Sequence, residues 1–245
     1  EVSGREIDGK GRLLMSGFFN AHAHSPMTLM RGYGENMVLQ DWLTKKIFPF
    51  EDKLTGEAVY WGTMLAMAES LKFGIVATSD MYDFCDDMAR AVADSGTKNN
   101  ISRSIANPMG ADVSRLESFD EMKHFYREFN DAADGRIIVD MSLHAEYTSN
   151  PETAVALADY ARSLDGVKMQ VHVSETEFEH SECIKRHGMT PAAYLEKTGI
   201  FDVPAVAAHC VYSDDSDLEI FKRKGVTVAA NPVSNMKLAS GICNV

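Results

Sequence analysis

Short apolar runs alternate along this chain with longer segments in which apolar residues recur at helical spacing. The clearest helical segment covers residues 57–72, and Gly74 supplies a stop just after it. The apolar runs predict strands at residues 17–21, 75–78, 101–106, 136–143, 168–173, 205–208 and 226–230. The segments between them predict helices at residues 57–72, 86–93, 116–130, 151–163, 181–187 and 190–197.

Strands that alternate with helices in this order predict parallel pairing and an α/β barrel, since parallel neighbours need a long crossover connection. The chain has 245 residues, of which 45% are hydrophobic, and this suits one barrel domain over residues 1–245. The polar opening at residues 1–15 is compatible with a small hairpin edge. No eighth strand is recognised after residues 226–230.

Composition narrows the function classes. The formal net charge is −12 and the basic residues are scattered, which argues against nucleic acid and anionic membranes as partners. The four cysteines form no C-x-x-C pair and are too few for a disulfide scaffold, so we expect a reduced, cytoplasmic compartment. No apolar run approaches the ~20 residues that a membrane span needs. No signal peptide is visible, although Glu1 is not a natural start.

Histidines stand at the ends of several predicted strands. His22 and His24 are spaced i, i+2, which places both imidazoles on one face of a strand, close enough to share a metal ion. His172 and His209 end two later strands in the same way. Taken alone, the His22/His24 pair is better explained as a chance pair on a solvated strand, and His172 as a packed core histidine. Barrel enzymes build their sites at these strand ends, so His22, His24 and His172 together predict a metal site.

An acid lies close to this predicted site. Glu175 follows His172 by three positions, where its carboxylate could carry a proton from a metal-bound water to a substrate and on to a leaving amine. His209 is expected to hold and polarise that water or the developing alkoxide. The alternative for Glu175 is a solvated acid, and we expect that explanation to hold for its neighbours Glu177 and Glu179.

The order of these motifs resembles the amidohydrolase superfamily, and within it the branch that deaminates adenosine-type compounds such as S-adenosylhomocysteine and methylthioadenosine. The motifs are residues 18–24, 170–175, 205–210 and 231–238, and the resemblance covers essentially the whole chain. It implies a (β/α)8 TIM-type metal-dependent hydrolase barrel. Strand eight and most of the terminal β-sandwich would be absent, with residues 1–15 as a remnant of the sandwich.

The resemblance assigns His22, His24 and His172 as metal ligands. Zn²⁺ is the expected metal, with Fe²⁺ as the alternative. Relatives with two metals usually carry a lysine at the end of strand four, but this chain has His144 there, so we expect one metal ion. The last ligand of the family, an aspartate after strand eight, has no counterpart here. We therefore expect the sequence to be an interior part of a longer enzyme.

The same resemblance implies residues that contact the substrate. His144 would contact it directly, Trp42 would cover its apolar part, and Glu51 would accept hydrogen bonds from both ribose hydroxyls. Arg103 and Arg115, twelve positions apart, would face the amino-acid carboxylate of adenosylhomocysteine. Without the family, Trp42 would be interpreted as core and the charged residues as surface groups.

We therefore predict an enzyme that deaminates adenosine-type purine nucleosides to inosine-type products with release of ammonia. The partner is this small molecule, and a homo-oligomeric state is left open. Two alternatives stay open at this point. The first is deamination or dechlorination of another N-heterocycle, of the s-triazine, guanine or cytosine type, although Glu175 together with His209 favours deamination. The second is an inactive remnant that only binds nucleosides.

Overall fold

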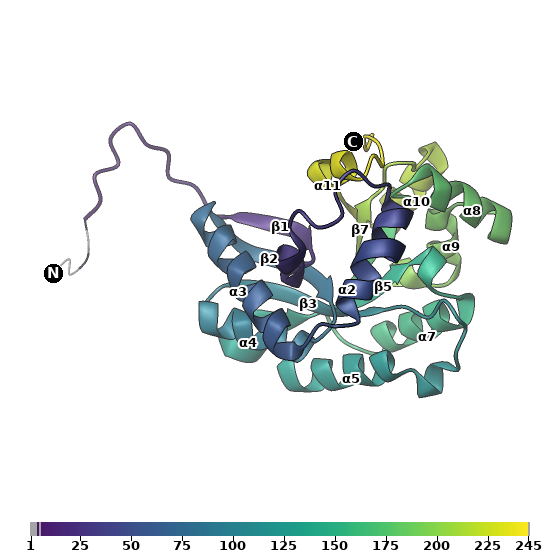
Figure 1. The fold of residues 1–245 in the computed structure, drawn as a ribbon, viewed down its shortest axis with the longest axis horizontal. Helices are drawn as coiled ribbons and strands as arrows, with labels where there is room; N and C mark the ends of the chain where they lie inside the picture. The colour runs from purple at the N-terminus through teal and green to yellow at the C-terminus, as the bar shows by residue number, and fades with distance from the viewer. Residues whose placement is uncertain (1–3, 5, 245) are drawn as a thin grey trace.

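The computed structural model describes residue 4 and residues 6–244. All strands pair in parallel and follow the spatial order β1-β2-β3-β5-β6-β7-β8, while β4 pairs with β3 alone (Figure 1). Their bounds are β1 Phe18–Ala23, β2 Ile75–Tyr82, β3 Lys98–Ile105, β4 Ile137–Val139, β5 Met141–Ala145, β6 Met169–Val173, β7 Ala205–His209 and β8 Thr227–Ala229. The seven predicted strands are confirmed, and the fourth is divided at Asp140 into β4 and β5.

Helices cover the outside of this curved sheet (Figure 1). The longer ones are α3 Gly56–Lys72, α4 Cys85–Ser95, α5 Glu117–Phe129, α7 Pro151–Arg162, α8 Glu177–His187, α9 Pro191–Lys197 and α10 Asp215–Lys224. The short ones are α1 Leu39–Trp42, α2 Phe48–Glu51, α6 Ala132–Gly135 and α11 Pro232–Lys237, and a π-helical turn at Leu43–Ile47 joins α1 to α2. The predicted helices are present, and the chain folds as the expected α/β barrel type.

Apart from the short helices α1, α2, α6 and α11, which the sequence does not predict, α8 and α10 differ most from the prediction. Helix α8 begins four residues earlier than residue 181, because the Thr176 side chain accepts a hydrogen bond from the Glu179 backbone and caps the helix there. Helix α10 was not predicted, since its apolar positions are few. It is held by a capping box between Asp214 and Asp217 and ends at Gly225, whose φ of 67° suits a helix C-terminus.

The core lies between the sheet and the helices. On β5 and β6, Met141, Leu143, Met169 and Val171 are completely buried, as short apolar strands that are covered on both faces require. Because parallel strands all run the same way, their carboxyl ends meet at one end of the sheet. The histidines predicted to bind metal therefore reach a common place from β1 and β6, which are not neighbours.

The barrel is open on one side within the described residues. There β1 pairs only with β2, β8 pairs only with β7, and the two do not pair with each other. This confirms the expected opening beside the first and last strands. The predicted sandwich remnant at residues 1–15 falls partly outside the described residues, and residues 6–15 contain no strand. None of the described helices is both long and apolar enough for a membrane crossing.

Candidate active site and metal centre

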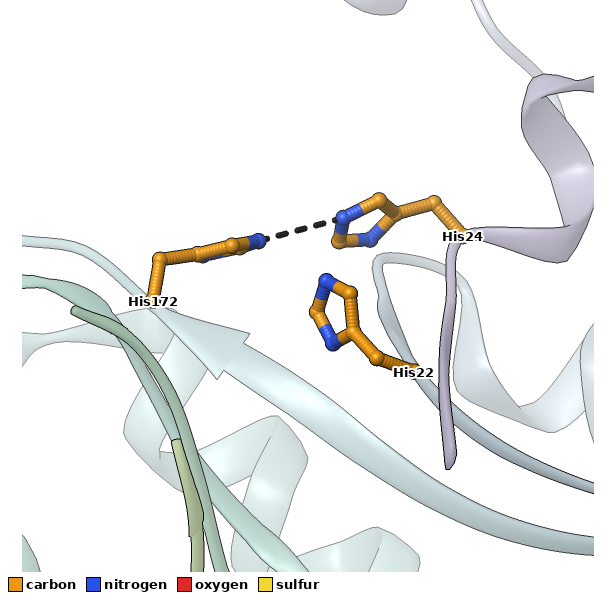
Figure 2. A group of neighbouring side chains, drawn as sticks. All are labelled: His22, His24 and His172. Atoms are coloured by element: carbon orange, nitrogen blue, oxygen red, sulfur yellow. Dashed lines mark hydrogen bonds between the residues drawn. The ribbon is translucent and has the colours of Figure 1, made fainter. Parts of the chain in front are cut away.

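Three histidine rings converge at the carboxyl end of the sheet (Figure 2). His22 lies on β1, His24 directly follows that strand, and His172 lies on β6. The His22 ring centroid is 4.8 Å from those of both His24 and His172, and one ligand nitrogen of each residue lies within 4.8 Å of the others. The structure thus brings together all three residues that the sequence predicted as metal ligands.

Backbone carbonyls orient two of these rings. His24 Nδ1 lies 2.7 Å from the Met81 carbonyl oxygen, and His172 Nδ1 lies 2.6 Å from the His144 carbonyl oxygen. A carbonyl oxygen can only accept, so in each ring the proton is on Nδ1 and the neutral Nε2 carries a free lone pair. The two Nε2 atoms face one another at 3.2 Å, along the dashed line in Figure 2.

This arrangement fits a metal ion better than a hydrogen bond. Burial lowers the pKa of His24 and of His172, which disfavours a proton between their Nε2 atoms. Two nitrogens bound tetrahedrally to Zn²⁺ at the usual bond length lie about 3.3 Å apart, close to the separation seen here. The third ring agrees, because His22 Nε2 is buried without a hydrogen-bond partner among the described residues. The three residues therefore fit a metal site.

His209 and Glu175 lie beside this cluster and are both buried. The His209 ring centroid is 5.6 Å from that of His22, and Glu175 Oε1 is 3.5 Å from His209 Nδ1. His209 Nδ1 is also 2.8 Å from Asn235 Oδ1, an acceptor that keeps the proton on Nδ1. Ser174 and His209 have φ angles of 47° and 73°, so the backbone turns sharply where both catalytic candidates are presented.

Burial shifts the pKa of the acid and the pKa values of the histidines in opposite directions. It raises the pKa of Glu175 to about 8, with a smaller contribution from the charge of Glu179. Burial also lowers the pKa of His144 and of His209 to about 4. Near neutral pH the site therefore combines a carboxyl group that retains a proton with neutral imidazoles. This combination suits proton transfer beside a metal ion.

A cavity of about 470 Å³ opens over the cluster, within the range of small-molecule sites. It is lined by most of the predicted site residues, namely His24, Trp42, Glu51, Arg103, His144, His172, Glu175 and His209. Arg115 is not among the lining residues and is exposed on the short turn Val113–Arg115. The sequence-derived set is therefore gathered around one cavity, and only His22, which belongs to the histidine cluster, and Arg115 are not part of its wall.

Arg103 already has acidic partners in this wall. Its Nη1 pairs with Asp83 and lies 2.6 Å from the Ser104 carbonyl oxygen, and its Nε lies 2.6 Å from Glu121 Oε2. No partner is recorded for its Nη2 among the described residues. A ligand carboxylate would therefore meet a guanidinium whose charge is partly balanced by the protein.

Several residues that support the site were not recognised from the sequence. Tyr82 donates a hydrogen bond to Glu51, and Asn235 accepts one from His209. Glu179 accepts the backbone N–H groups of Ser174 and Glu175 at 2.9 and 2.7 Å. The expectation that Glu179 is solvated is wrong, because helix α8 turns it inward and leaves it 1% exposed. The sequence signal was its position on the helix that follows β6.

Fold and site together define a class of protein, a parallel α/β barrel with a histidine cluster that fits a metal ion at the carboxyl ends of its strands. The family model of the Amidohydrolase family matches residues 13–245, and the chain belongs to this family. The family resemblance found in the sequence is thereby confirmed.

Several relatives with curated names are deaminases. The chain is 43% identical over 242 residues to the 5-methylthioadenosine/S-adenosylhomocysteine deaminase of Pelotomaculum thermopropionicum, covering 99% of this chain and 55% of the relative. It is 41% identical over 238 residues to the 5'-deoxyadenosine deaminase of Methanospirillum hungatei, covering 96% and 52%. The chain thus spans about half the length of these curated relatives.

Among solved structures, an adenosine deaminase from Xanthomonas campestris with bound zinc is similar. The TM-score is 0.85 with 31% identity, and the match covers 94% of this chain and 52% of that one. This agreement supports the barrel architecture that the sequence predicted.

Proposed function

We propose that this chain carries the substrate cavity and most of the metal site of an aminohydrolase that deaminates adenosine-type nucleosides. Water replaces the amino group on the purine ring, so that an inosine-type product and ammonia are formed. The observation that carries the proposal is the cluster of His22, His24 and His172, two of which line one cavity together with Glu175. The names of the relatives support the substrate class.

A single divalent ion, with zinc favoured and iron as the alternative, would be held by His22, His24 and His172. Three imidazole nitrogens suit zinc, and the similar Xanthomonas campestris structure holds zinc. When bound, such an ion lowers the pKa of a water molecule so that it can attack at neutral pH. The backbone carbonyls of Met81 and His144 keep two of the rings oriented for that ion.

Glu175 would move the proton that the reaction requires. Near neutral pH this buried carboxyl group carries a proton, which it would donate to the ring nitrogen of the purine. The resulting carboxylate would then take up a proton that the attacking water loses and pass it to the departing ammonia. The raised pKa of Glu175 suits this task, because the group must hold a proton near neutral pH. His209, whose Nδ1 is held by Asn235, would accept a hydrogen bond from the attacking water through Nε2.

The remaining wall residues would bind the nucleoside. Trp42 covers its apolar part, Glu51 accepts hydrogen bonds from the ribose hydroxyls, and His144 contacts the base. Arg103 and Arg115 would recognise the carboxylate of adenosylhomocysteine, and the place of Arg103 in the cavity wall supports its share of this role. Arg115 has no such support from its position.

A direct assay tests the proposal. Protein loaded with Zn²⁺ is mixed with adenosine, methylthioadenosine and adenosylhomocysteine, and deamination is followed by the change in ultraviolet absorbance, with metal content measured in parallel. We expect turnover that is lost after chelation and restored by Zn²⁺. Binding of the nucleosides without any turnover by the metal-loaded protein would support the inactive-remnant alternative and contradict the proposed function.

The cytoplasmic location is also part of the proposal. All four cysteines, Cys85, Cys183, Cys210 and Cys243, are free, in agreement with a reducing compartment. The expectations about oligomeric state, nucleic acid and membrane partners stay predictions.

A further inference from the structure

Tyr82 makes a contact for which neither the fold nor the proposed chemistry accounts. It ends strand β2, is 6% exposed, and donates a hydrogen bond from its hydroxyl to Glu51 Oε1 at 2.7 Å. Both side chains line the cavity. Within the described residues, this is the only hydrogen bond recorded for the Glu51 carboxylate.

We propose that Tyr82 is a positioning residue that sets the preference for a ribose with free hydroxyls, acting through Glu51. The inference rests on the proposed function, in which Glu51 receives those hydroxyls. An ionised carboxylate has two oxygens and only accepts hydrogen bonds. Tyr82 donates to Oε1 and leaves Oε2 without a recorded partner among the described residues, available to accept from the sugar.

Glu51 and Tyr82 lie on two elements that differ in how firmly they are held, and the hydrogen bond connects these elements. Glu51 ends the four-residue helix α2, and it is preceded by a π-helical turn. Tyr82 belongs to an eight-residue strand that pairs with β1 and β3 on its two sides. The hydrogen bond therefore fixes a side chain on a short, irregular segment to the rigid sheet.

The directions in which the pKa values of Glu51 and Tyr82 shift agree with this role. Burial raises the pKa of Glu51, and the hydrogen bond from Tyr82 opposes that shift, so Tyr82 favours the ionised, accepting form. Burial and the neighbouring Glu51 charge also raise the pKa of Tyr82, which keeps its hydroxyl protonated and able to donate. The hydroxyl of Tyr82 is thus committed to Glu51 rather than to a ligand.

The experiment measures kcat/KM of the Zn²⁺-loaded protein for adenosine and for 2',3'-dideoxyadenosine, which lacks both sugar hydroxyls. In the parent we expect adenosine to be preferred, and in Tyr82→Phe we expect this preference to fall about 10-fold, as loss of a hydrogen bond to a charged group implies. Glu51→Asp keeps the charge but withdraws the carboxylate from Tyr82, and the same fall is expected. Glu51→Gln should lose most of the preference.

A double variant separates positioning from a general structural role. In the Glu51→Gln background, adding Tyr82→Phe should change the ratio by less than about two-fold, since the partner is already lost. Tyr194→Phe is the control, because the Tyr194 hydroxyl is buried without a partner among the described residues and lies outside the cavity wall. It should leave the ratio unchanged.

The outcomes that overturn the inference are distinct from failure of the proposed function. An equal loss for both nucleosides in Tyr82→Phe, or an unchanged ratio, would show that Tyr82 does not act on sugar recognition. A full effect that persists in the Glu51→Gln background would show that it acts by another route. If the parent turns over neither nucleoside, the proposed function and this inference both fall.

Discussion

At the scale of single residues, the position of each proton decides what the site can do. His24, His172 and His209 each have an acceptor at Nδ1, so all three expose an unprotonated Nε2. Glu175, in contrast, is buried with its pKa raised to about 8. The site thus separates groups that offer lone pairs from a group that holds a proton.

Replacement of Glu175 tests this division. In a complete version of the enzyme, Glu175→Gln keeps the shape of the side chain but cannot carry a proton, so turnover of adenosine should fall by roughly 10²–10⁴, while metal content and nucleoside affinity are retained. Initial rates, elemental analysis and equilibrium binding provide the three measurements. Glu177→Gln is the control, because Glu177 is exposed on the same turn. A Glu175→Gln enzyme within a few-fold of the parent would remove Glu175 from the mechanism.

The arginines provide a second test at this scale. Arg103→Ala and Arg115→Ala should each weaken binding of adenosylhomocysteine more than of adenosine, by about 1.5–3 kcal/mol where a charge-assisted contact is lost. The comparison of Kd values for the two ligands checks this. Since Arg103 lines the cavity and Arg115 is exposed, the larger effect is expected for Arg103. Equal losses for both ligands would mean that the arginines are structural.

At the scale of elements, three consecutive residues at the end of β2 position three different parts of the site. The Met81 carbonyl orients His24, the Tyr82 hydroxyl holds Glu51, and the Asp83 carboxylate pairs with Arg103. The proposed places for metal, sugar and substrate tail are therefore all positioned by the end of one strand.

The turn between β6 and α8 allows a test by pH. Burial raises the pKa of Glu179 to about 7, whereas an unfolded glutamate titrates near 4.3. Between these values the folded state retains more protons than the unfolded state, so this group makes stability decrease as pH rises from about 4.3 to 7. Glu179→Gln removes the titration, and its unfolding free energy should fall less steeply over that window.

Chemical denaturation of metal-free parent and variant at several pH values measures the two slopes. Glu177→Gln, at an exposed position on the same helix, serves as control and should follow the parent. Identical slopes for parent and Glu179→Gln would show that Glu179 titrates normally and that its burial has no such effect.

The extent of sequence prediction follows from the same elements. Strands and strand-end histidines were predictable, because apolar runs and the spacing of His22 and His24 are local signals. The hydrogen-bond partners of the site residues were not predictable, because Tyr82 and Glu51, and likewise His209 and Asn235, come into contact only after the barrel folds. Helix α10 was not predicted, because its capping residues rather than apolar periodicity define it.

At the scale of the whole molecule, metal binding should be coupled to stability. An ion that binds only the folded protein stabilises it by about 2.7 kcal/mol when free metal is 100-fold above Kd. Chelation should therefore lower Tm, and His172→Ala should have low metal content and no response to chelator. Elemental analysis and thermal unfolding measure both. His124→Ala, which changes an exposed histidine on α5, should behave as the parent. Full metal content in His172→Ala would contradict the ligand assignment.

The wide separation of the proposed metal ligands along the chain has a consequence for the order of folding. His24 and His172 are 148 positions apart, and closing a loop of this length costs about 4 kcal/mol of chain entropy. An unfolded chain does not hold these nitrogens together, so an ion cannot serve as an early nucleus. The strands between β1 and β6 must therefore assemble first. Metal binding would then come late in folding, because it requires a correctly assembled barrel.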